Sequence, residues 1–336
     1  MTGLSLPGDR ETVGQTLEDY LLDRTPDDAP HRAAAKTVLA IAEAAGPVAF
    51  RLSQAELLGD PARVVGTNTG GDRQKALDVA SHEHFLAALR GAGVEAIASE
   101  EADEVAEGVP GGLVSVAIDP IDGSSGIGVG ALLGTLFAVL PARDGKEFYR
   151  QSGRALLAAG YISYGHSVDF GFSVGKGVAI ATFDPGARIF RVVAENIAIP
   201  AGTSEVAFNA LAQRHWSPGV RAYVEACVAG REGERGRDFN MRWMAAAVGD
   251  LQRILKRGGM FFYAADRRPG YEAGRLRLVY EANPIAFLCE QAGGAATDGL
   301  RPILDIPPAE LHQHTPLVFG SREEVETFGR YLSRAD

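Results

Sequence analysis

Cysteine is scarce in this sequence, with only two among 336 residues. Cys227 and Cys289 each lie in an apolar, helix-like stretch, so we predict buried thiols in a reducing compartment rather than a disulfide framework. Uninterrupted apolar runs are also short, well below the ~20 residues that a membrane span needs. No basic leader followed by an apolar run opens the chain. These absences indicate a cytoplasmic protein without a membrane partner.

Positive charge is likewise in the minority, because 33 Lys and Arg face 43 Asp and Glu and give a formal net charge of -10. Nucleic acids and anionic membranes both bind basic surfaces, so we exclude them as main partners. A small anionic substrate remains compatible if a metal or local basic residues neutralise it. The hydrophobic content of 46% allows a large buried core, in one α/β unit or two closely packed subdomains.

Hydrophobic periodicity gives the expected order of elements. We place an N-terminal subdomain at 1–200 and a C-terminal subdomain at 201–336. The helical period predicts helices over 31–58, 74–90, 218–229 and 241–257. Short strand-like segments at 135–140, 157–164, 168–174, 178–183 and 187–193 predict a mixed or antiparallel sheet. A further strand is expected over 276–280. The Gly/Thr/Asn-rich stretch at 66–72 could form a mobile lid.

The chemistry centres on the stretch 118–125. A mostly apolar run at 113–118 predicts a buried strand. It ends at Asp119 and Asp122, which flank a rigid Pro120 and precede Gly123-Ser124-Ser125. Carboxylates and backbone carbonyls at a strand end are ligands for a hard divalent cation. The hydroxyl and N–H groups after Gly123 could face a phosphate.

Other charged residues each have a simpler alternative explanation. Glu100 and Glu101 could form an ordinary solvated turn, but a second carboxylate pair at another strand end favours a shared cation site. Glu281 could simply compensate a helix dipole. Arg275 and Arg277 could grip phosphate oxygens or lie on an exposed strand face. We interpret His166, His215, His312 and His314 as structural.

Several motifs together resemble one family. They are Gly71-Asp72-Arg73-Gln74-Lys75-Ala76-Leu77-Asp78-Val79, Ser99-Glu100-Glu101, Asp119-Pro120-Ile121-Asp122-Gly123-Ser124-Ser125, and Gly274-Arg275-Leu276-Arg277-Leu278-Val279-Tyr280-Glu281-Ala282-Asn283-Pro284. Their order resembles class 1 fructose-1,6-bisphosphatases, within the lithium-sensitive, magnesium-dependent sugar and inositol phosphatase superfamily. The resemblance runs from about Gly66 to Ser321. It implies a layered α/β/α/β/α sugar phosphatase fold and a homotetramer.

The resemblance also implies roles for individual residues. Glu100, Asp119, Asp122, Glu281 and the carbonyl of Ile121 would hold two or more Mg²⁺ ions, with Mn²⁺ able to substitute. Asp72 would join from the lid, and Glu101 and Asp78 would orient and activate the attacking water. Gly123, Ser124 and Ser125 would hold the reacting 1-phosphate. The other substrate-binding candidates are Asn209, Tyr263, Arg275 and Arg277, and Arg242 would reach in from a neighbouring subunit.

Some positions depart from the family pattern. Asn209 is followed by Ala210-Leu211-Ala212, where the family has Glu-Gly-Tyr, so a phenol is lost from the far-phosphate site. Trp243, Arg275 and Gly126 replace the usual tyrosine, lysine and asparagine. The lost phenol motivates the hypothesis that sedoheptulose 1,7-bisphosphate is a second substrate. Leu113, Val114 and Pro141 occupy the positions of an AMP site, which is therefore expected to be absent, as in Calvin-cycle bacterial enzymes.

Two alternatives stay open at this stage. The chain could be another phosphatase of the superfamily, acting on an inositol phosphate or a nucleotide 3'-phosphate. Those enzymes usually carry a Trp-Asp pair at the late metal position, whereas this chain has Glu281-Ala282-Asn283-Pro284. It could also be a catalytically silent binding homologue, although every expected metal ligand is present.

Overall fold

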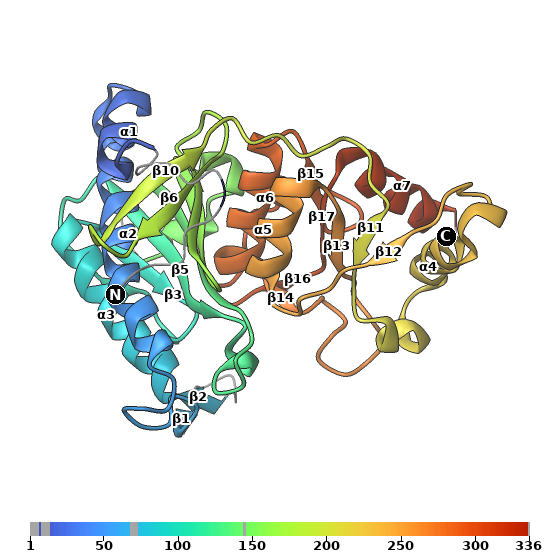
Figure 1. Ribbon diagram of the computed structural model, residues 1–336, viewed down its shortest axis with the longest axis horizontal. Coiled ribbons are helices and arrows are strands. Elements are labelled where there is room, and N and C mark those ends of the chain that lie inside the picture. The colour runs from blue at the N-terminus through green and yellow to red at the C-terminus, as the bar shows by residue number, and fades with distance from the viewer. Residues whose placement is uncertain (1–6, 8–13, 68–72, 144–145, 335–336) are drawn as a thin grey trace.

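The computed structural model describes residues 7, 14–67, 73–143 and 146–334. The chain builds alternating layers of helices and sheets (Figure 1). The outer helices α1 (Leu17–Arg24), α2 (Ala29–Ser53) and α3 (Ala76–Ala92) cover an eight-stranded sheet. Helices α5 (Ala247–Arg257) and α6 (Asn283–Gln291) separate it from a five-stranded sheet, which α4 (Pro218–Ala229) and α7 (Arg322–Ser333) cover on its far side. The predicted α/β/α/β/α order is confirmed.

Helix α2 shows how the outer layer forms. Asp28 caps its N-terminus by accepting a hydrogen bond from the His31 N–H at 3.0 Å. Buried Val38, Ile41 and Ala45 recur at helical spacing and pack on the sheet. The helix passes through Pro47 without a break and ends at Ser53, earlier than predicted. By length and composition it could cross a membrane, but its apolar face belongs to the core between the helices and the sheet.

The eight-stranded sheet sets up the two strand ends that carry the acidic residues. Its order is β10 (Ile189–Ala194), β9 (Ala179–Asp184), β8 (Val168–Ser173), β7 (Ala158–Tyr164), β6 (Leu133–Pro141), β5 (Val114–Asp122), β3 (Ala96–Ser99) and β4 (Ala106–Glu107). Neighbouring strands in it are antiparallel except for β3 and β5, which are parallel with Ser99 opposite Ile118. The predicted mixed or antiparallel character is confirmed. Because parallel strands end at the same sheet edge, Glu100 and Asp119 emerge side by side.

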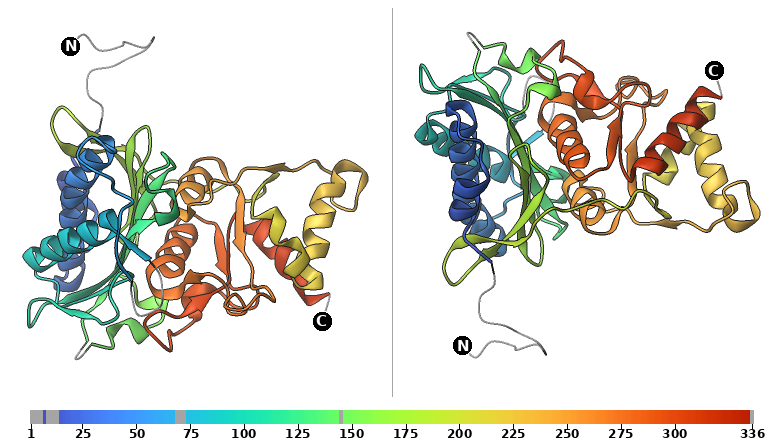
Figure 2. Two further views of the ribbon diagram at one scale, coloured as in Figure 1. Left: turned by 90° about the horizontal axis from the view of Figure 1, so that it is seen from below. Right: turned by 90° about the horizontal axis from the view of Figure 1, so that it is seen from above.

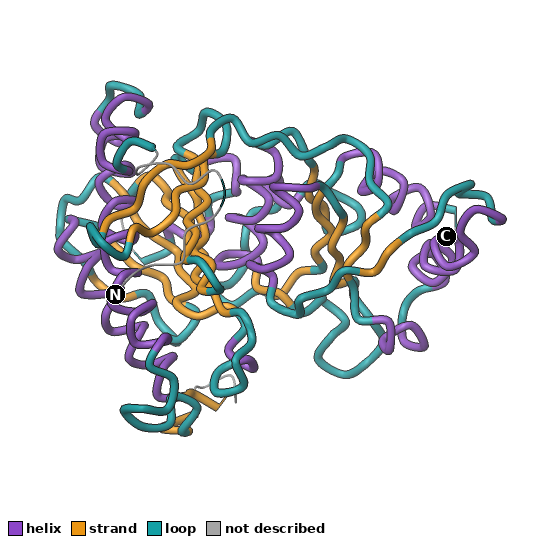
Figure 3. The backbone as a smooth tube through the Cα atoms, viewed as in Figure 1, coloured by secondary structure: helices purple, strands orange, loops and turns teal. Residues whose placement is uncertain are grey.

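The second sheet lies beyond the middle helices. Its order is β12 (Asn240–Met241), β11 (Glu205–Ala207), β13 (Met260–Tyr263), β17 (Leu317–Gly320) and β15 (Ala295–Thr297). Figure 2 shows, in two further views, that the yellow and red helices α4 and α7 lie farthest from the blue outer layer. The strands of the two large sheets form separate groups with the middle helices between them (Figure 3). A single core cluster takes residues from both sheets, so the division near residue 200 stays a prediction.

Two elements differ from the sequence prediction. Helix α5 begins at Ala247 rather than at 241, because Asn240 and Met241 pair with β11 and Ala245 adopts a left-handed φ of 67°. The strand expected over 276–280 is only β14 (Leu276–Arg277), paired with β16 (His314–Thr315). It is followed by one π-helical turn, Leu278–Ala282, which leads into α6. Both differences lie beside the residues expected to bind substrate or metal.

The region predicted as a lid is described only at its ends. β1 (Val64–Thr67) and β2 (Arg73–Lys75) pair antiparallel. Residues 68–72, including Asp72, lie outside the described residues.

Candidate active site

A β-bulge brings the two aspartates of β5 to the same side. Side chains alternate along a strand, so residues three apart normally point to opposite faces. Here Asp119 pairs with Leu136 and Asp122 pairs with Gly134, which leaves one extra residue on β5. Both carboxyl groups are buried, and Asp119 Oδ1 accepts the Ile121 N–H at 2.9 Å. The Asp-Pro-Ile-Asp spacing therefore builds a paired carboxylate site through this bulge.

The turn after Asp122 depends on glycine. Gly123 has a φ of 81°, which L side chains rarely adopt, and an added Cβ would come 3.0 Å from the Cβ of Ala246. The turn continues as a short 3-10 helix, Ser124–Gly126. Lys75 Nζ donates to the Ser124 carbonyl at 2.6 Å and ties this turn to the end of β2. No role for Lys75 was predicted, because its distance along the sequence from the turn does not indicate a contact.

Three carboxylates form a compact buried cluster. Ligand oxygens of Asp119, Asp122 and Glu281 all lie within 4.8 Å of one another. Glu281 reaches the cluster from the π-helical turn, where its Oε2 accepts the Arg277 N–H at 2.6 Å. Glu100 lies close enough to interact with all three carboxylates, and it forms an ion pair with the Arg277 guanidinium. The four acidic residues predicted as metal ligands are therefore brought together.

The protonation of this cluster reflects burial and repulsion. Burial, followed by the charges of neighbouring carboxylates such as Glu100, holds the pKa of Asp119 and of Glu281 well above the ordinary range. Burial also raises the pKa of Asp122 to about 6, although the Val248 N–H at 2.8 Å opposes the rise. Such a set of oxygen ligands fits a hard divalent cation, which would replace the protons and offset the repulsion.

Two further carboxylates lie beside the cluster. Asp78 Oδ2 accepts the Lys75 N–H at 3.0 Å at the start of α3, and its Oδ1 has no hydrogen-bond partner among the described residues. Gln74 Nε2 donates to the Glu101 carbonyl at 2.9 Å and to Glu101 Oε2 at 3.4 Å. Burial and the charges of Asp78 and Glu100 raise the pKa of Glu101 to about 7. A carboxylate with this pKa can take up a proton near neutral pH.

Asp78 and Glu101 line a cavity of about 690 Å³. Among the described residues, Asp119, Asp122 and Glu281 are not part of its lining. The predicted site residues that line it are Asp78, Glu100, Glu101, Ser124, Arg275 and Arg277. Tyr271 also lines it, and nothing in its sequence context indicates a site. His312 and His314, interpreted as structural from sequence, line the cavity as well, so that interpretation was incomplete. His312 does have a structural contact, because its Nε2 lies 3.1 Å from the Ala102 carbonyl.

Of the four residues expected at the far phosphate, Tyr263 and Arg275 contact each other, whereas Asn209 and Arg242 lie elsewhere. The Tyr263 ring lies under the Arg275 guanidinium, 5.7 Å from its centroid, and packs edge-on against the Trp243 ring at 6.5 Å. Asn209 instead caps its own 3-10 turn by accepting the Leu211 N–H at 3.1 Å. The Arg242 side chain is 57% exposed, with Nε 4.0 Å from Glu205 Oε1. In the described part of the chain, neither Asn209 nor Arg242 lines the cavity of the carboxylates.

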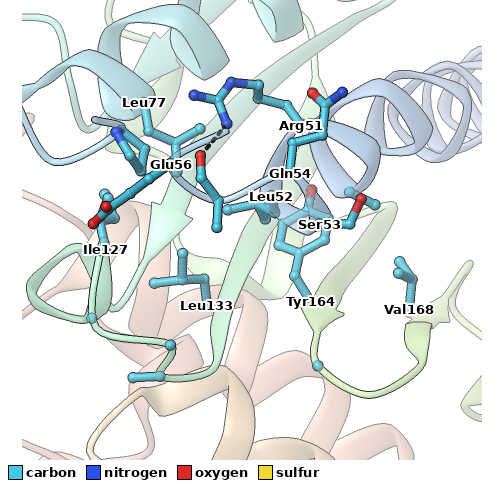
Figure 4. A pocket seen from close by; sticks show the side chains of 18 of the residues that line it. Arg51, Leu52, Ser53, Gln54, Glu56, Leu77, Ile127, Leu133, Tyr164 and Val168 are labelled. Atoms are coloured by element: carbon cyan, nitrogen blue, oxygen red, sulfur yellow. Dashed lines mark hydrogen bonds between the residues drawn. The ribbon is translucent and has the colours of Figure 1, made fainter. Parts of the chain in front are cut away.

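A second cavity, of about 820 Å³, opens at the C-terminal end of α2 (Figure 4). Leu52, Leu133 and Tyr164 line it, and Arg51 spans its rim by donating to the Ala55 carbonyl at 2.8 Å. Its lining is mainly apolar and does not include Asp119, Asp122 or Glu281. The smaller polar cavity is therefore the chemically competent one.

Comparison with known proteins agrees with this geometry. Residues 15–195 match the family description "Fructose-1-6-bisphosphatase, N-terminal domain", and residues 199–333 match "Fructose-1-6-bisphosphatase, C-terminal domain". The chain is 52% identical over 330 residues to the class 1 fructose-1,6-bisphosphatases of Brucella suis and Brucella ovis, covering 98% of this chain and 97% of each relative.

Solved structures lead to the same family. The holo form of Leishmania major fructose-1,6-bisphosphatase superposes with a TM-score of 0.88 at 28% identity, covering 96% of this chain and 100% of that one. The T-state of the same enzyme gives a TM-score of 0.84 at 28% identity with the same coverage. With its two strand-end carboxylate pairs, its glycine turn and these full-length similarities, the chain belongs to the fructose-1,6-bisphosphatase family.

Proposed function

We propose that this protein hydrolyses the 1-phosphate of fructose 1,6-bisphosphate to give fructose 6-phosphate and phosphate. The observation that carries the proposal is the buried cluster of Asp119, Asp122 and Glu281, next to a glycine turn and a cavity lined by arginines. The carboxylates suit metal ions, and the arginines suit a substrate with two phosphates.

The metal site would use oxygen ligands only. We propose that Glu100, Asp119, Asp122, Glu281 and the carbonyl of Ile121 hold two or more Mg²⁺ ions, with Mn²⁺ able to substitute, and that Asp72 contributes from its loop. When bound, these ions would neutralise the phosphate and stabilise the attacking and leaving oxygens. The β-bulge carries Asp119 and Asp122, and the π-helical turn carries Glu281.

The protein groups around the phosphate have distinct roles in this proposal. Glu101 and Asp78 orient the attacking water and accept its proton, a role supported by the pKa of about 7 for Glu101. Gly123, Ser124 and Ser125 hold the reacting phosphate, and Asp122 borders the same turn. Lys75 keeps that turn in place through the Ser124 carbonyl. Arg277, paired with Glu100, connects the metal cluster with the substrate cavity.

The far phosphate would be held by Tyr263 and Arg275, with Asn209 and a neighbouring subunit's Arg242. Arg242 is 57% exposed and, among the described residues, is not part of the lining of its own cavity, which supports a role across an interface. We propose a cytoplasmic homotetramer that binds neither nucleic acid nor membranes. Apolar side chains support association, because Leu22 and Phe50 on the outer helices are 76% and 67% exposed beside two surface cavities.

Sedoheptulose 1,7-bisphosphate is a second candidate substrate. The segment after Asn209 consists of Ala210, Leu211 and Ala212, with no phenol or carboxylate to restrict the far end of a longer sugar. This substrate range would suit carbohydrate metabolism of the Calvin-cycle type, with fructose 1,6-bisphosphate hydrolysis also serving gluconeogenesis.

Phosphate release from purified protein tests the proposal. Fructose 1,6-bisphosphate should be hydrolysed only with Mg²⁺ or Mn²⁺, and AMP should not slow the reaction. Asp122→Asn should abolish turnover with the fold intact. Activity on inositol phosphates or 3'-phosphonucleotides alone would favour another superfamily phosphatase, and complete inactivity would favour a silent homologue. Hydrolysis of the six-carbon sugar alone would reject the seven-carbon candidate.

A further inference from the structure

The segment Arg242–Ala246 joins the edge strand β12 to α5 without helix or strand structure of its own. It begins where the Arg242 N–H donates to the Val206 carbonyl at 2.8 Å. It ends after Ala245 in a left-handed conformation with a φ of 67°. Arg242 and Trp243, both assigned here to the far-phosphate region, lie on this segment. Its conformation therefore decides where those two side chains are presented.

Asp250, in the first turn of α5, fixes the middle of the segment. Its carboxylate is fully buried, and Oδ2 accepts the Met244 N–H at 3.0 Å. Oδ1 accepts a hydrogen bond from Arg253 Nη2 at 3.1 Å, one helical turn further along. Both oxygens of this side chain are thus committed to the segment and to α5.

Arg253 extends the connection to the five-stranded sheet. Its Nη1 donates to Glu205 Oε2 at 3.0 Å and to the Gly258 carbonyl at 3.3 Å. The guanidinium packs so tightly against Gly259 that a Cβ there would come 2.6 Å from Nη1. Because Glu205 pairs with Asn240 of β12, the connection returns to the strand that carries the segment.

The two ends of the segment lead to the two halves of the substrate site. Next to Met244, the Trp243 ring packs against Tyr263, which lies under Arg275. At the other end, the Val248 N–H donates to Asp122 Oδ2 at 2.8 Å. A shift of Met244 would therefore move the Trp243 ring and the Tyr263 ring that it contacts. The hydrogen bond between Val248 and Asp122 does not involve Met244 and would hold the start of α5 independently.

We propose that Asp250 and Arg253 are positioning residues that hold the Arg242–Ala246 segment in the geometry required to bind the far phosphate. This inference rests on the proposed function, because it assigns the segment to substrate binding. Burying a charged pair rarely adds stability compared with apolar residues of similar size, since desolvation offsets the attraction. The Asp250–Arg253 pair instead fixes the Met244 N–H, next to Trp243, so we assign it a positioning role.

Steady-state kinetics and direct binding test the proposal. In Asp250→Ala, losing a hydrogen bond to a charged acceptor should raise KM for fructose 1,6-bisphosphate and Kd for fructose 6-phosphate about tenfold. The kcat value and the KM for fructose 1-phosphate, which lacks the far phosphate, should change less than about threefold. A purely structural defect would instead lower the active fraction with both substrates and leave KM unchanged.

Asp250→Asn is the conservative variant, because its amide oxygen can still accept the Met244 N–H while its NH₂ group cannot accept from Arg253. It should recover part of the affinity that Asp250→Ala loses. Arg257→Ala is the matched control. Arg257 contacts Glu205 Oε1 at 3.3 Å but is 68% exposed, and among the described residues it forms no hydrogen bond or ion pair with Asp250. The KM of Arg257→Ala should therefore stay at the wild-type value. If Asp250→Ala does not fold, Arg253→Met is used with the same measurements.

The outcomes separate this inference from the proposed function. A folded Asp250→Ala or Arg253→Met protein with wild-type KM and Kd would overturn the positioning role. Equal losses with fructose 1-phosphate and the bisphosphate would also overturn it. Failure of the wild-type protein to bind fructose 6-phosphate or to hydrolyse the bisphosphate would instead reject the proposed function.

Discussion

Asp122→Asn should make the metal-free protein more stable at about pH 8 while removing its activity. In the folded protein the pKa of Asp122 is raised from 3.8 to about 6, mainly because the carboxyl group is buried. One pKa unit corresponds to about 1.4 kcal/mol, so ionising this carboxylate in the metal-free fold costs about 3 kcal/mol. Asparagine removes that cost, and its amide oxygen can still accept the Val248 N–H.

The same shift fixes the direction of the pH dependence. Between the two pKa values the folded protein binds more protons than the unfolded chain, so the unfolding free energy falls as the pH rises. For Asp122 this window runs from about pH 4 to about pH 6. The raised pKa values of Asp119 and Glu281 act in the same direction. Mg²⁺ should reverse the trend, adding about 2.7 kcal/mol per site at a hundredfold excess over Kd.

Urea denaturation in EDTA, at about pH 5 and about pH 8, measures these differences. Asp266→Asn is a control of opposite sign, because a hydrogen bond from Arg268 lowers the pKa of Asp266. Neutralising Asp266 should destabilise the protein at about pH 8. If metal-free wild-type protein is equally stable at both pH values, and Asp122→Asn is no more stable than wild type, the buried carboxylates do not repel one another as proposed. Their assignment as a metal site is then wrong.

The remaining predictions concern the other parts of the site. Because Glu101 would act as a base, kcat should fall with decreasing pH along a limb at or below about 7, and Glu101→Gln should be inactive at every pH in the same phosphate-release assay. Lys75→Met should lower kcat about tenfold because it releases the Ser124 carbonyl, and Lys75→Arg should lower kcat less. If the two variants have the same kcat, Lys75 does not hold the phosphate-binding turn through this hydrogen bond. Arg275→Ala should raise KM for the bisphosphate but not for fructose 1-phosphate, which separates far-phosphate binding from a general loss of charge. Mixing inactive Asp122→Asn subunits with Arg242→Ala subunits should restore low-KM turnover if Arg242 acts across an interface, and no recovery in confirmed hybrids would place its action within one subunit.

Much of the fold could be predicted because its signals are local. A series of short strand-like segments predicted the mixed or antiparallel sheet, and helical spacing predicted most of α2, α3 and α4. The prediction for α5 began several residues too early, because its sequence is helix-compatible before Ala247. Pairing of Asn240 and Met241 with β11 overrides that local preference. The strand expected over 276–280 is present only at Leu276–Arg277, because the π-helical turn that follows it and presents Glu281 has no simple periodicity.

The sequence by itself determined the chemistry of the stretch 118–125. Its carboxylates, proline and glycine turn are neighbours along the chain, so their types and spacing already indicate a strand-end cation site beside a phosphate-binding turn. Tertiary structure decided which distant groups complete it: the parallel pairing of β3 and β5 brings Glu100 to Asp119, and Lys75 and Val248 reach the turn from other elements. It also decided that Asp250 holds Met244 and that Arg242 lies away from its own cavity. These contacts depend on packing between layers, which a linear spacing of residues does not record.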